Sequence, residues 1–309
     1  MVLGSGFAGY SMLLRLQKDL FDVTLVSPRN YFLFLPLLPS AVTGTVELRS
    51  IVEPVRRRLG HVRFLEASAH AVDWQRRVVK AVGAVDGTPF ELPFDRLVIA
   101  VGGRPQDFGI PGVSTYALRA ASIEDAREIR GRILSQFARA GLPGIDAEEL
   151  LRLLTFVVIG GGPTGVEVAA EIHDLLRGEL RRAFPELAPR SRIVLLEGGD
   201  RLLSQFRQAL AGYAEKQFRR DGMEVRTHTT VASIGAKEIQ LRDGGILPYG
   251  MAIWATGHGP TPFVSGLSDL PQLRGRIVVN SFLEVPGFEG VYALGDCAAC
   301  GDPPLPATA

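Results

Sequence analysis

The sequence has few cysteines and no long apolar run. Only Cys297 and Cys300 occur among its 309 residues, which excludes a disulfide framework. The pair is spaced C-x-x-C, but no second dithiol and no zinc-ligand partner lies nearby in the sequence, so a redox or zinc motif is disfavoured and no metal site is expected. The most apolar stretch, residues 31–42, is too short to span a membrane and contains Pro36 and Pro39.

An excess of charge of one sign is also missing. The 34 lysines and arginines nearly balance the 33 aspartates and glutamates, which leaves a net charge of +1. This balance gives no electrostatic case for binding nucleic acid. The five histidines are scattered, which indicates surface or packing roles. With 46% hydrophobic residues, the chain is long enough for two domains that each bury a core.

What the sequence does contain is two glycine fingerprints of the form G-x-G-x-x-G, at residues 4–9 and 160–165. Each follows an apolar strand pattern and precedes a helix-like stretch. In such a turn the first glycine permits the tight bend, the second lets the backbone approach a pyrophosphate, and the third lets the helix pack on the strand. The N–H groups at the start of the helix then face the phosphates. Two copies predict two dinucleotides held by one chain.

The two fingerprints open segments of the same plan. The segments from Gly4 to Gly102 and from Gly160 to Gly257 have almost the same length, and each ends on a strand carrying Ala-x-Gly. We interpret them as duplicated α/β units of the Rossmann type. The patterns predict helices near residues 9–20, 48–59, 122–141 and from the second fingerprint to Leu176, with strands at 22–26, 155–159 and 192–196 and a strand-rich stretch at 224–247.

The residue after the second strand of such a unit is expected to be an acid that accepts the ribose hydroxyls. In the second segment this residue is Glu197, which predicts a preference for NADH because a carboxylate repels the 2′-phosphate of NADPH. Arg201 is the nearby basic residue that could soften this preference. Its alternative role is to start a helix or to pack against one.

The first segment departs from the acid rule. Its strand-end residue is Ser27, followed by Pro28 and Arg29, which by itself would suit NADP. Near the end of the chain, however, residues 290–298 read as a strand ending in Gly-Asp. Asp296 can accept a hydrogen bond there from the ribityl chain of a flavin. We therefore interpret the first site as an FAD site completed by a segment from the far end of the chain.

Two carboxylates follow the second fingerprint on one helix face. Glu167 and Glu171 are spaced i and i+4. Glu167 lies just past the phosphate-binding turn, where it could point toward the junction of flavin and nicotinamide, so it is the candidate catalytic residue. The alternative is a solvated or salt-bridged pair.

Several motifs together resemble the type II (alternative) NADH:quinone oxidoreductases. Residues 156–167, 293–298 and 305–309 carry the family resemblance, and residues 27–32 and 108–112 are similar to its fungal, plant and protist branch. In that branch Ser-Pro-Arg follows the second strand of a site that takes FAD, which accounts for Ser27. The resemblance covers nearly the whole chain. It implies a glutathione-reductase-like (FAD/NAD(P)-binding) fold with an FAD-binding domain of residues 1–117 and 263–309 around an NADH-binding domain of residues 118–262.

The resemblance also implies a reaction and its residues. NADH would reduce FAD, and the flavin would pass two electrons to a quinone without proton pumping. The implied FAD site comprises Gly4, Gly6, Phe7, Ala8, Gly9, Ser27, Pro28, Arg29, Ala69, Ala100, Gly102 and Asp296. The implied NADH site comprises Gly160, Gly162, Pro163, Thr164, Gly165, Glu197, Ala255, Thr256 and Gly257.

Family members are peripheral membrane proteins. The resemblance therefore implies the mitochondrial inner membrane, or a bacterial plasma membrane, and allows a homodimer. In the family a stretch like residues 305–309 continues into a quinone-site motif and amphipathic anchoring helices, whereas this sequence ends at Ala309 and its first strand begins at Met1. The expectation is a fragment that binds nucleotides but is poor in quinone reduction and in membrane binding.

Two other functions stay open at this point. A sulfide:quinone oxidoreductase shares the fold, but its chemistry needs reactive cysteines beside the flavin, and the sequence offers only Cys297 and Cys300. A non-catalytic flavoprotein that senses NADH belongs to a different class. In such a sensor the flavin bleached by NADH stays bleached as a stable charge-transfer complex, whereas in an NADH:quinone oxidoreductase a quinone rapidly restores its colour.

Overall fold

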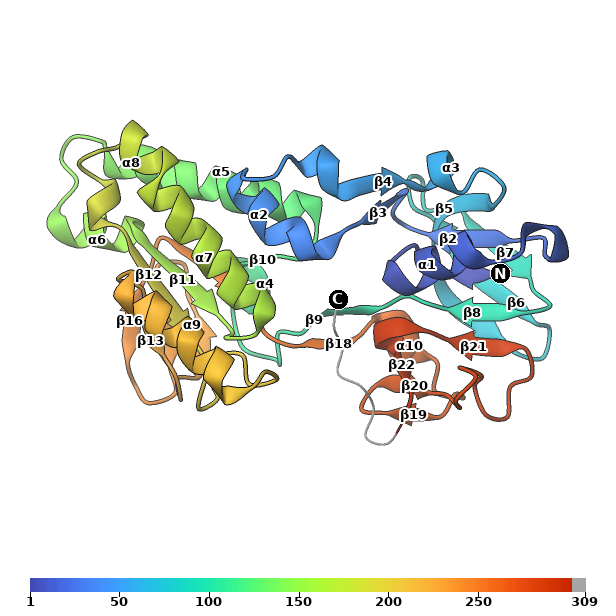
Figure 1. The fold of residues 1–309 in the computed structure, drawn as a ribbon. Helices are drawn as coiled ribbons and strands as arrows, with labels where there is room; N and C mark the ends of the chain where they lie inside the picture. Colours follow the sequence, from blue (N-terminus) through green and yellow to red (C-terminus); the bar gives the residue numbers. More distant parts are fainter. Residues whose placement is uncertain (302–309) are drawn as a thin grey trace. The chain divides into compact units, whose positions relative to one another are not determined.

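The computed structural model describes residues 1–301 and divides the chain into two compact units, which can be followed by colour in Figure 1. The first unit comprises Met1–Leu35, Val52–Arg104 and the described residues from His258 onward. The second unit comprises Pro36–Ile51 and Pro105–Gly257. The predicted boundaries, after residues 117 and 262, both lie later in the chain than these, and the insertion of Pro36–Ile51 into the second unit was not predicted.

Packing explains where the chain divides. Strand β10 (Ala117–Arg119) pairs in parallel with β17 (Met251–Trp254), and Val113 belongs to the same buried core as Trp254. Residues 105–117 are therefore part of the second unit. At the other boundary, Val264 of α10 (Pro262–Gly266) packs in the core of the first unit.

The first unit is built on a seven-stranded sheet with the order β21-β8-β1-β2-β5-β6-β7. The strands from β21 to β5 are parallel, and β5, β6 and β7 form an antiparallel meander. Their bounds are β1 (Val2–Leu3), β2 (Thr24–Ser27), β5 (Arg63–Asp73), β6 (Val78–Gly83), β7 (Pro89–Pro93), β8 (Leu97–Ile99) and β21 (Val291–Ala293). Smaller strands of this part of the chain are β3 (Tyr31–Leu33), β4 (Val52–Pro54), β9 (Gly103–Pro105), β18 (His258–Pro260), β19 (Gln272–Leu273), β20 (Arg276–Val278) and β22 (Ala298–Ala299).

The second unit is built on a five-stranded parallel sheet with the order β10-β17-β11-β12-β13. Strands β11 (Thr155–Ile159) and β12 (Arg192–Leu196) have the predicted bounds, and β13 spans Glu224–Arg226. The predicted strand-rich stretch continues into an antiparallel sheet of β14 (Val231–Ile234), β15 (Glu238–Leu241) and β16 (Ile246–Pro248).

The two units share one topology. In each, the strand before the fingerprint is flanked on one side by the next parallel strand and on the other by the strand that ends in Ala-x-Gly. The predicted α/β fold with two Rossmann-like units is confirmed. The strand beyond the Ala-x-Gly strand has a different origin in each unit. In the first unit this strand is β21, from the end of the chain, and in the second it is β10, which precedes the second fingerprint.

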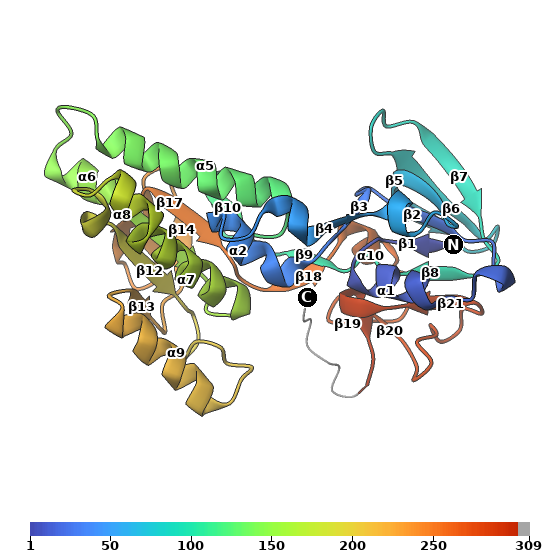
Figure 2. The same ribbon diagram turned by 45° about the horizontal axis from the view of Figure 1, so that its top comes forward.

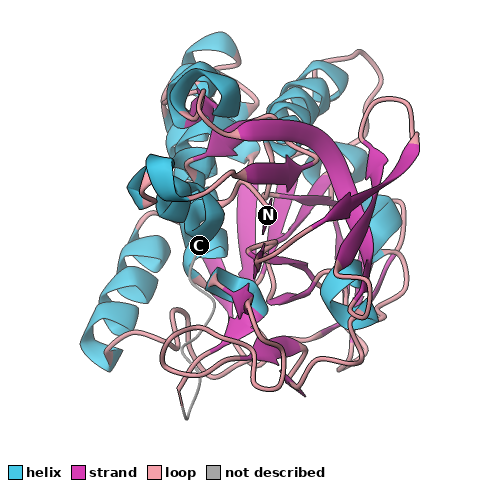
Figure 3. Ribbon diagram, turned by 90° about the vertical axis from the view of Figure 1, so that its right-hand side faces the viewer, coloured by secondary structure: helices cyan, strands magenta, loops and turns pink. Residues whose placement is uncertain are grey.

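Figure 3 distinguishes the helices, in cyan, from the strands, in magenta. The helix predicted at residues 122–141 is α5 (Ile123–Ala140), which begins where the Ser122 hydroxyl accepts a hydrogen bond from the Asp125 amide. The other helices are α1 (Phe7–Arg15), α2 (Leu38–Thr43), α3 (Val55–Arg58), α4 (Val113–Tyr116), α6 (Ala147–Leu153), α7 (Pro163–Arg177), α8 (Glu179–Ala183) and α9 (Gln208–Arg220).

The helix predicted at residues 48–59 was wrong. The segment is a 3₁₀ turn (Leu48–Ile51), the strand β4 and the short α3. Strand β4 pairs with β3, and Pro54 has no N–H group with which to continue a helical ladder. The predicted helix at residues 9–20 likewise ends earlier, at Arg15.

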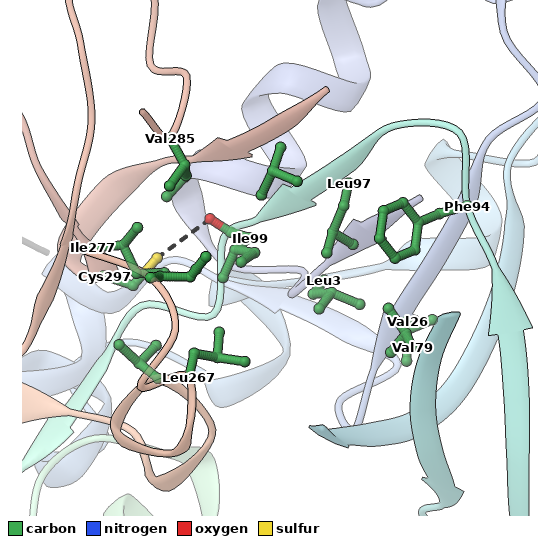
Figure 4. Close-up of a cluster of buried hydrophobic side chains, with 14 of the residues drawn as sticks. Leu3, Val26, Val79, Phe94, Leu97, Ile99, Leu267, Ile277, Val285 and Cys297 are labelled. Atoms are coloured by element: carbon green, nitrogen blue, oxygen red, sulfur yellow. Dashed lines mark hydrogen bonds between the residues drawn. The ribbon is translucent and has the colours of Figure 1, made fainter. Parts of the chain in front are cut away.

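The core of the first unit brings both ends of the described chain together. Figure 4 shows Leu3 and Val26 near one end of a cluster that also contains Ile99, Ile277 and Cys297. The second unit buries β11 on both faces, with Phe156 stacked on Phe137 of α5 at 6.2 Å between ring centroids. Such continuous apolar strands are typical of parallel sheets that are covered on both sides.

Candidate functional site

The first fingerprint opens onto a cavity of about 850 Å³ in the first unit. Residues from distant parts of the chain line it, among them the fingerprint turn, the ends of β2 and β8, β5, and the turn after β21. Of the residues predicted for the first site, all but Gly9 line this cavity, namely Gly4, Gly6, Phe7, Ala8, Ser27, Pro28, Arg29, Ala69, Ala100, Gly102 and Asp296.

Gly9 contributes to the turn in another way. A Cβ atom on Gly9 would clash with the carbonyl oxygen of Gly4, so the start of α1 can pack this closely only without a side chain. Gly4 itself has a φ of +102°, which favours glycine. Gly6 has no heavy atom within 4 Å of where its Cβ would be, so its backbone is open for the approach of a ligand.

Ser27 does not act as a substitute acid. Its side chain is buried at 3% exposure, and its Oγ lies 2.8 Å from the Oγ of Ser5 in the fingerprint. The Ser27 Oγ also accepts a hydrogen bond from the Arg29 amide, and the Ser5 hydroxyl donates to the Arg29 carbonyl. The two serines therefore tie the fingerprint to the loop after β2. The sequence analysis missed Ser5 because position 5 is a variable position of the motif.

The structure brings Asp296 to the first fingerprint, as predicted. Asp296 lies in a 3₁₀ turn, Gly295–Cys297, directly after β21. Gly295 has a φ of +72°, and a Cβ on it would stand 2.9 Å from the Cβ of Ala8 in α1. The turn therefore reaches the cavity by packing its backbone against the fingerprint helix.

A further wall of the cavity was not predicted from the sequence. His258, Thr261, Pro262 and Phe263 line the cavity from β18 and the start of α10. They follow the second Ala-x-Gly strand, but no motif in the sequence assigns them to the first fingerprint.

Cys297 is part of the core behind this turn. Its thiol donates to the carbonyl oxygens of Ile99 (3.3 Å, dashed in Figure 4) and Leu294 (3.2 Å). Burial raises the pKa of the Cys297 thiol to about 11. A thiol that stays protonated is a poor nucleophile, so Cys297 has a packing role.

The second fingerprint repeats the geometry of the first. Gly160 has a φ of +116°, and a Cβ on Gly165 would clash with the Gly160 carbonyl oxygen. Gly162 again has no heavy atom within 4 Å of a Cβ position. The end of the Ala-x-Gly strand packs closely against this turn. A Cβ atom added to Gly160 would clash with the backbone of Ala255 and Thr256.

Glu197 lies beside the second fingerprint at the end of β12. Its Oε2 accepts a hydrogen bond from the Gly161 amide at 2.6 Å, and its Oε1 accepts one from the Gly199 amide at 2.6 Å. The Arg201 guanidinium donates instead to the Ser204 carbonyl oxygen, so it does not neutralise this carboxylate by direct contact. The Thr256 hydroxyl is buried and has no hydrogen-bond partner among the described residues, which leaves it free for a ligand.

The two helix carboxylates have different environments. Glu171 accepts hydrogen bonds from the hydroxyls of Ser40 (2.5 Å), Thr43 (3.0 Å) and Thr45 (3.0 Å), so it fastens the inserted segment Pro36–Ile51 to α7. Figure 2 shows α2 of this segment beside α5 and α7. Glu167 has no ion pair or hydrogen bond from its carboxylate within residues 1–301. Partial burial, and secondly the charge of Glu171, raise the pKa of the Glu167 carboxyl.

Residues 1–301 contain neither a membrane-spanning helix nor a cluster of metal ligands. No helix there is long and apolar enough to cross a membrane, and no three or more His, Cys, Asp or Glu side chains are grouped to hold a metal ion. The motif at residues 305–309, which carried part of the resemblance, lies outside the described residues.

The fold and the site define a protein with two dinucleotide-binding units of one topology, each with a complete glycine turn. The model of the pyridine nucleotide-disulphide oxidoreductase family matches residues 1–309. The chain belongs to this family and, within it, to the type II (alternative) NADH dehydrogenases, so the resemblance recognised in the sequence is confirmed.

Three relatives support this assignment. The chain is 41% identical to an external alternative NAD(P)H-ubiquinone oxidoreductase (B4, mitochondrial) of Arabidopsis thaliana, over 96% of this chain and 53% of that protein. It is 39% identical to a probable NADH dehydrogenase of Dictyostelium discoideum, over 100% of this chain and 69% of that protein. The solved structure of NDH2 from Plasmodium falciparum in complex with NADH superposes with a TM-score of 0.91 at 32% identity, over 97% of this chain and 64% of that chain. The chain thus spans about half the length of the Arabidopsis relative.

Proposed function

We propose that the first unit binds FAD, that the second binds NADH, and that the chain performs the NADH-oxidising half of an NADH:quinone oxidoreductase. The observation that carries this proposal is the pair of equivalent glycine turns. In the second turn, the Gly161 amide donates a hydrogen bond to the Glu197 carboxylate. The proposed domain assignment follows the two units of the structure.

The first cavity suits a large dinucleotide. Its volume of about 850 Å³ is at the upper end of the range of about 300–1,000 Å³ for ligand pockets. The open backbone at Gly6 and the start of α1 would face the pyrophosphate, and Ser27 to Arg29 would hold the adenosine end. Asp296 would accept a hydrogen bond from the ribityl chain.

The second unit suits NADH. Glu197 would exchange part of its hydrogen bonding to backbone amides for the ribose hydroxyls, and Thr256 would gain a partner for its buried hydroxyl. The open backbone at Gly162 and the N–H groups of α7 would face the pyrophosphate. When bound, the flavin supplies the acceptor for the hydride that NADH donates.

We assign Glu167 as the candidate catalytic carboxyl beside the nicotinamide end of NADH. Its raised pKa lets it hold a proton closer to neutral pH than an ordinary glutamate does. Glu171, whose oxygens are occupied by three hydroxyls, positions α7 and the inserted segment rather than moving protons. In Glu167→Gln a rate of flavin reduction within about twofold of the parent would contradict the assignment.

The names of the relatives supply the remaining partners. We propose a quinone as the electron acceptor and a mitochondrial location, because the Arabidopsis relative is named as a mitochondrial ubiquinone oxidoreductase. Peripheral association with a membrane and a homodimer are proposed from the resemblance to the type II family.

The test uses the purified chain loaded with FAD under anaerobic conditions. NADH should bleach the oxidised-flavin absorbance, and a short-chain ubiquinone added afterwards should restore it rapidly. Bleaching that persists after quinone is added would favour an NADH-sensing flavoprotein, and an unbleached flavin would refute the proposal. Sulfide should not bleach the flavin, since the Cys297 thiol is buried and held protonated.

A further inference from the structure

A second, smaller cavity lies in the second unit, at the edge of the sheet opposite its fingerprint. The fingerprint follows the end of β11, whereas this cavity is lined by Ser191 and Asp221 to Met223, which precede the parallel strands β12 and β13. Because parallel strands begin at one edge and end at the other, the cavity is separate from the proposed NADH site. Its volume is about 250 Å³.

Basic side chains converge on this cavity. His173 and Arg177 reach it from the last turns of α7, and Arg181 reaches it from α8. No carboxylate within residues 1–301 forms an ion pair with either arginine. Arg177 donates one hydrogen bond, from Nη2 to the Asp221 carbonyl oxygen at 2.9 Å. This contact fixes the direction of the guanidinium and leaves further N–H donors for a ligand.

The acids near the cavity do not cancel this charge by direct pairing with the arginines. The Asp221 carboxylate accepts a hydrogen bond from Gln217 at 3.0 Å. Asp174, whose side chain is 80% exposed, lies 3.2 Å from the Nδ1 of His173. The Nε2 of His173 is shielded from solvent and has no hydrogen-bond partner among the described residues, so the ring is incompletely satisfied.

We propose that this cavity binds the phosphate group of a small soluble molecule. A guanidinium presents paired N–H donors that match two phosphate oxygens, and two guanidiniums with an imidazole form a common phosphate-binding set. The cavity is below the usual size of about 300 Å³ or more for drug-sized ligands, which suits a phosphate group and excludes a whole dinucleotide. The alternative role for Arg177, capping the carbonyls of helix ends, uses one of its donors and does not account for Arg181.

The test is isothermal titration calorimetry of the protein at constant ionic strength, with FAD and NAD⁺ present to fill the glycine turns. Inorganic phosphate and glycerol phosphate are titrated separately. We expect saturable binding with a dissociation constant of about 1 mM or below for at least one of them. Tighter binding of glycerol phosphate assigns the site to a phosphate monoester, and equal or tighter binding of inorganic phosphate assigns it to the free ion.

Matched variants locate the binding. Arg177→Gln and Arg181→Gln should each weaken phosphate binding about tenfold, because each removes a charge-assisted hydrogen-bonding group. The control, Arg182→Gln, removes the same charge one residue further along α8 at a position that does not line the cavity, and should leave the dissociation constant nearly unchanged. Arg181 is exposed and makes no hydrogen bond or ion pair within residues 1–301, so its variant should fold even if Arg177→Gln does not. The absence of saturable binding, or equal weakening in all three variants, would overturn the proposal.

Discussion

Replacing Glu197 by glutamine tests how the second unit selects its dinucleotide. The substitution removes a carboxylate that is held next to the fingerprint by two backbone amides, each 2.6 Å away. A 2′-phosphate bound about 5 Å from this carboxylate would be repelled by about 3 kcal/mol per unit charge at an effective dielectric constant of about 20. Solvent and salt reduce this to about 1–2 kcal/mol at a half-buried position, which corresponds to about 5- to 30-fold in selectivity.

The same substitution has a second effect that should cancel in the selectivity ratio. Glutamine is neutral and keeps one acceptor oxygen, so both amides lose a charge-assisted partner and one of them, that of Gly161 or Gly199, loses its acceptor. The lost bond costs about 1–3 kcal/mol of stability. This cost falls on the turn itself and therefore weakens the binding of NADH and NADPH alike.

The assay is the rate of flavin reduction by NADH and by NADPH, each measured over a range of concentrations in stopped flow. The ratio of kcat/KM for NADPH to that for NADH should rise by about 5- to 30-fold in Glu197→Gln. Asp200→Asn is the matched control, because it removes an equal charge from an exposed position in the same loop. An unchanged ratio in Glu197→Gln, or the same rise in both variants, would refute the reasoning.

Four further outcomes follow from individual contacts. Gly165→Ala should abolish NADH binding in a titration, because its Cβ would clash with the Gly160 carbonyl oxygen. Gly131→Ala in α5 has open space around it and should instead raise the free energy of unfolding, measured in urea, by about 0.5–1 kcal/mol. The free energy of unfolding should fall between pH 9 and 11 by about 3 kcal/mol, because burial raises the pKa of Cys297 from its usual 9.0 to about 11 and the unfolded thiol therefore loses its proton first. Urea unfolding of Cys297→Ala should show a correspondingly shallower alkaline loss, and an equal loss would contradict that assignment. Glu171→Gln should cost about 1.5–3 kcal/mol in the same assay, while Glu47→Gln at an exposed position of the inserted segment should cost almost nothing.

The parts of the fold that the sequence predicted correctly are those determined by local pattern. Strands β11 and β12 each contain an unbroken apolar run, at residues 156–159 and 193–196, and a helix start such as Ser122 has its own capping side chain. The segment at residues 48–59 shows the limit. Its helical pattern was overridden by the pairing of β4 with β3, a contact between residues that are distant in sequence.

The same limit holds for the site. The glycine turns could be predicted because each needs only six consecutive residues, and Glu197 could be predicted from its place after a strand. The three hydroxyls on Glu171 could not, since Ser40, Thr43 and Thr45 precede it by 131, 128 and 126 residues. The wall formed by His258 and its neighbours depends in the same way on where the chain returns to the first unit.

Comparison of the two turns shows why the first unit can depart from the acid rule. In the first unit the strand-end residue Ser27 contacts Ser5, which follows the first glycine. In the second unit the strand-end residue Glu197 contacts Gly161, which follows the first glycine there. A hydrogen bond between the strand end and the glycine turn is therefore present in both units. Two hydroxyls form it in the first unit, and a carboxylate and a backbone amide form it in the second. Only the contact in the second unit carries a negative charge. If this charge selects the nucleotide, as proposed, Glu197→Gln should change selectivity while the strand end stays hydrogen-bonded to the turn.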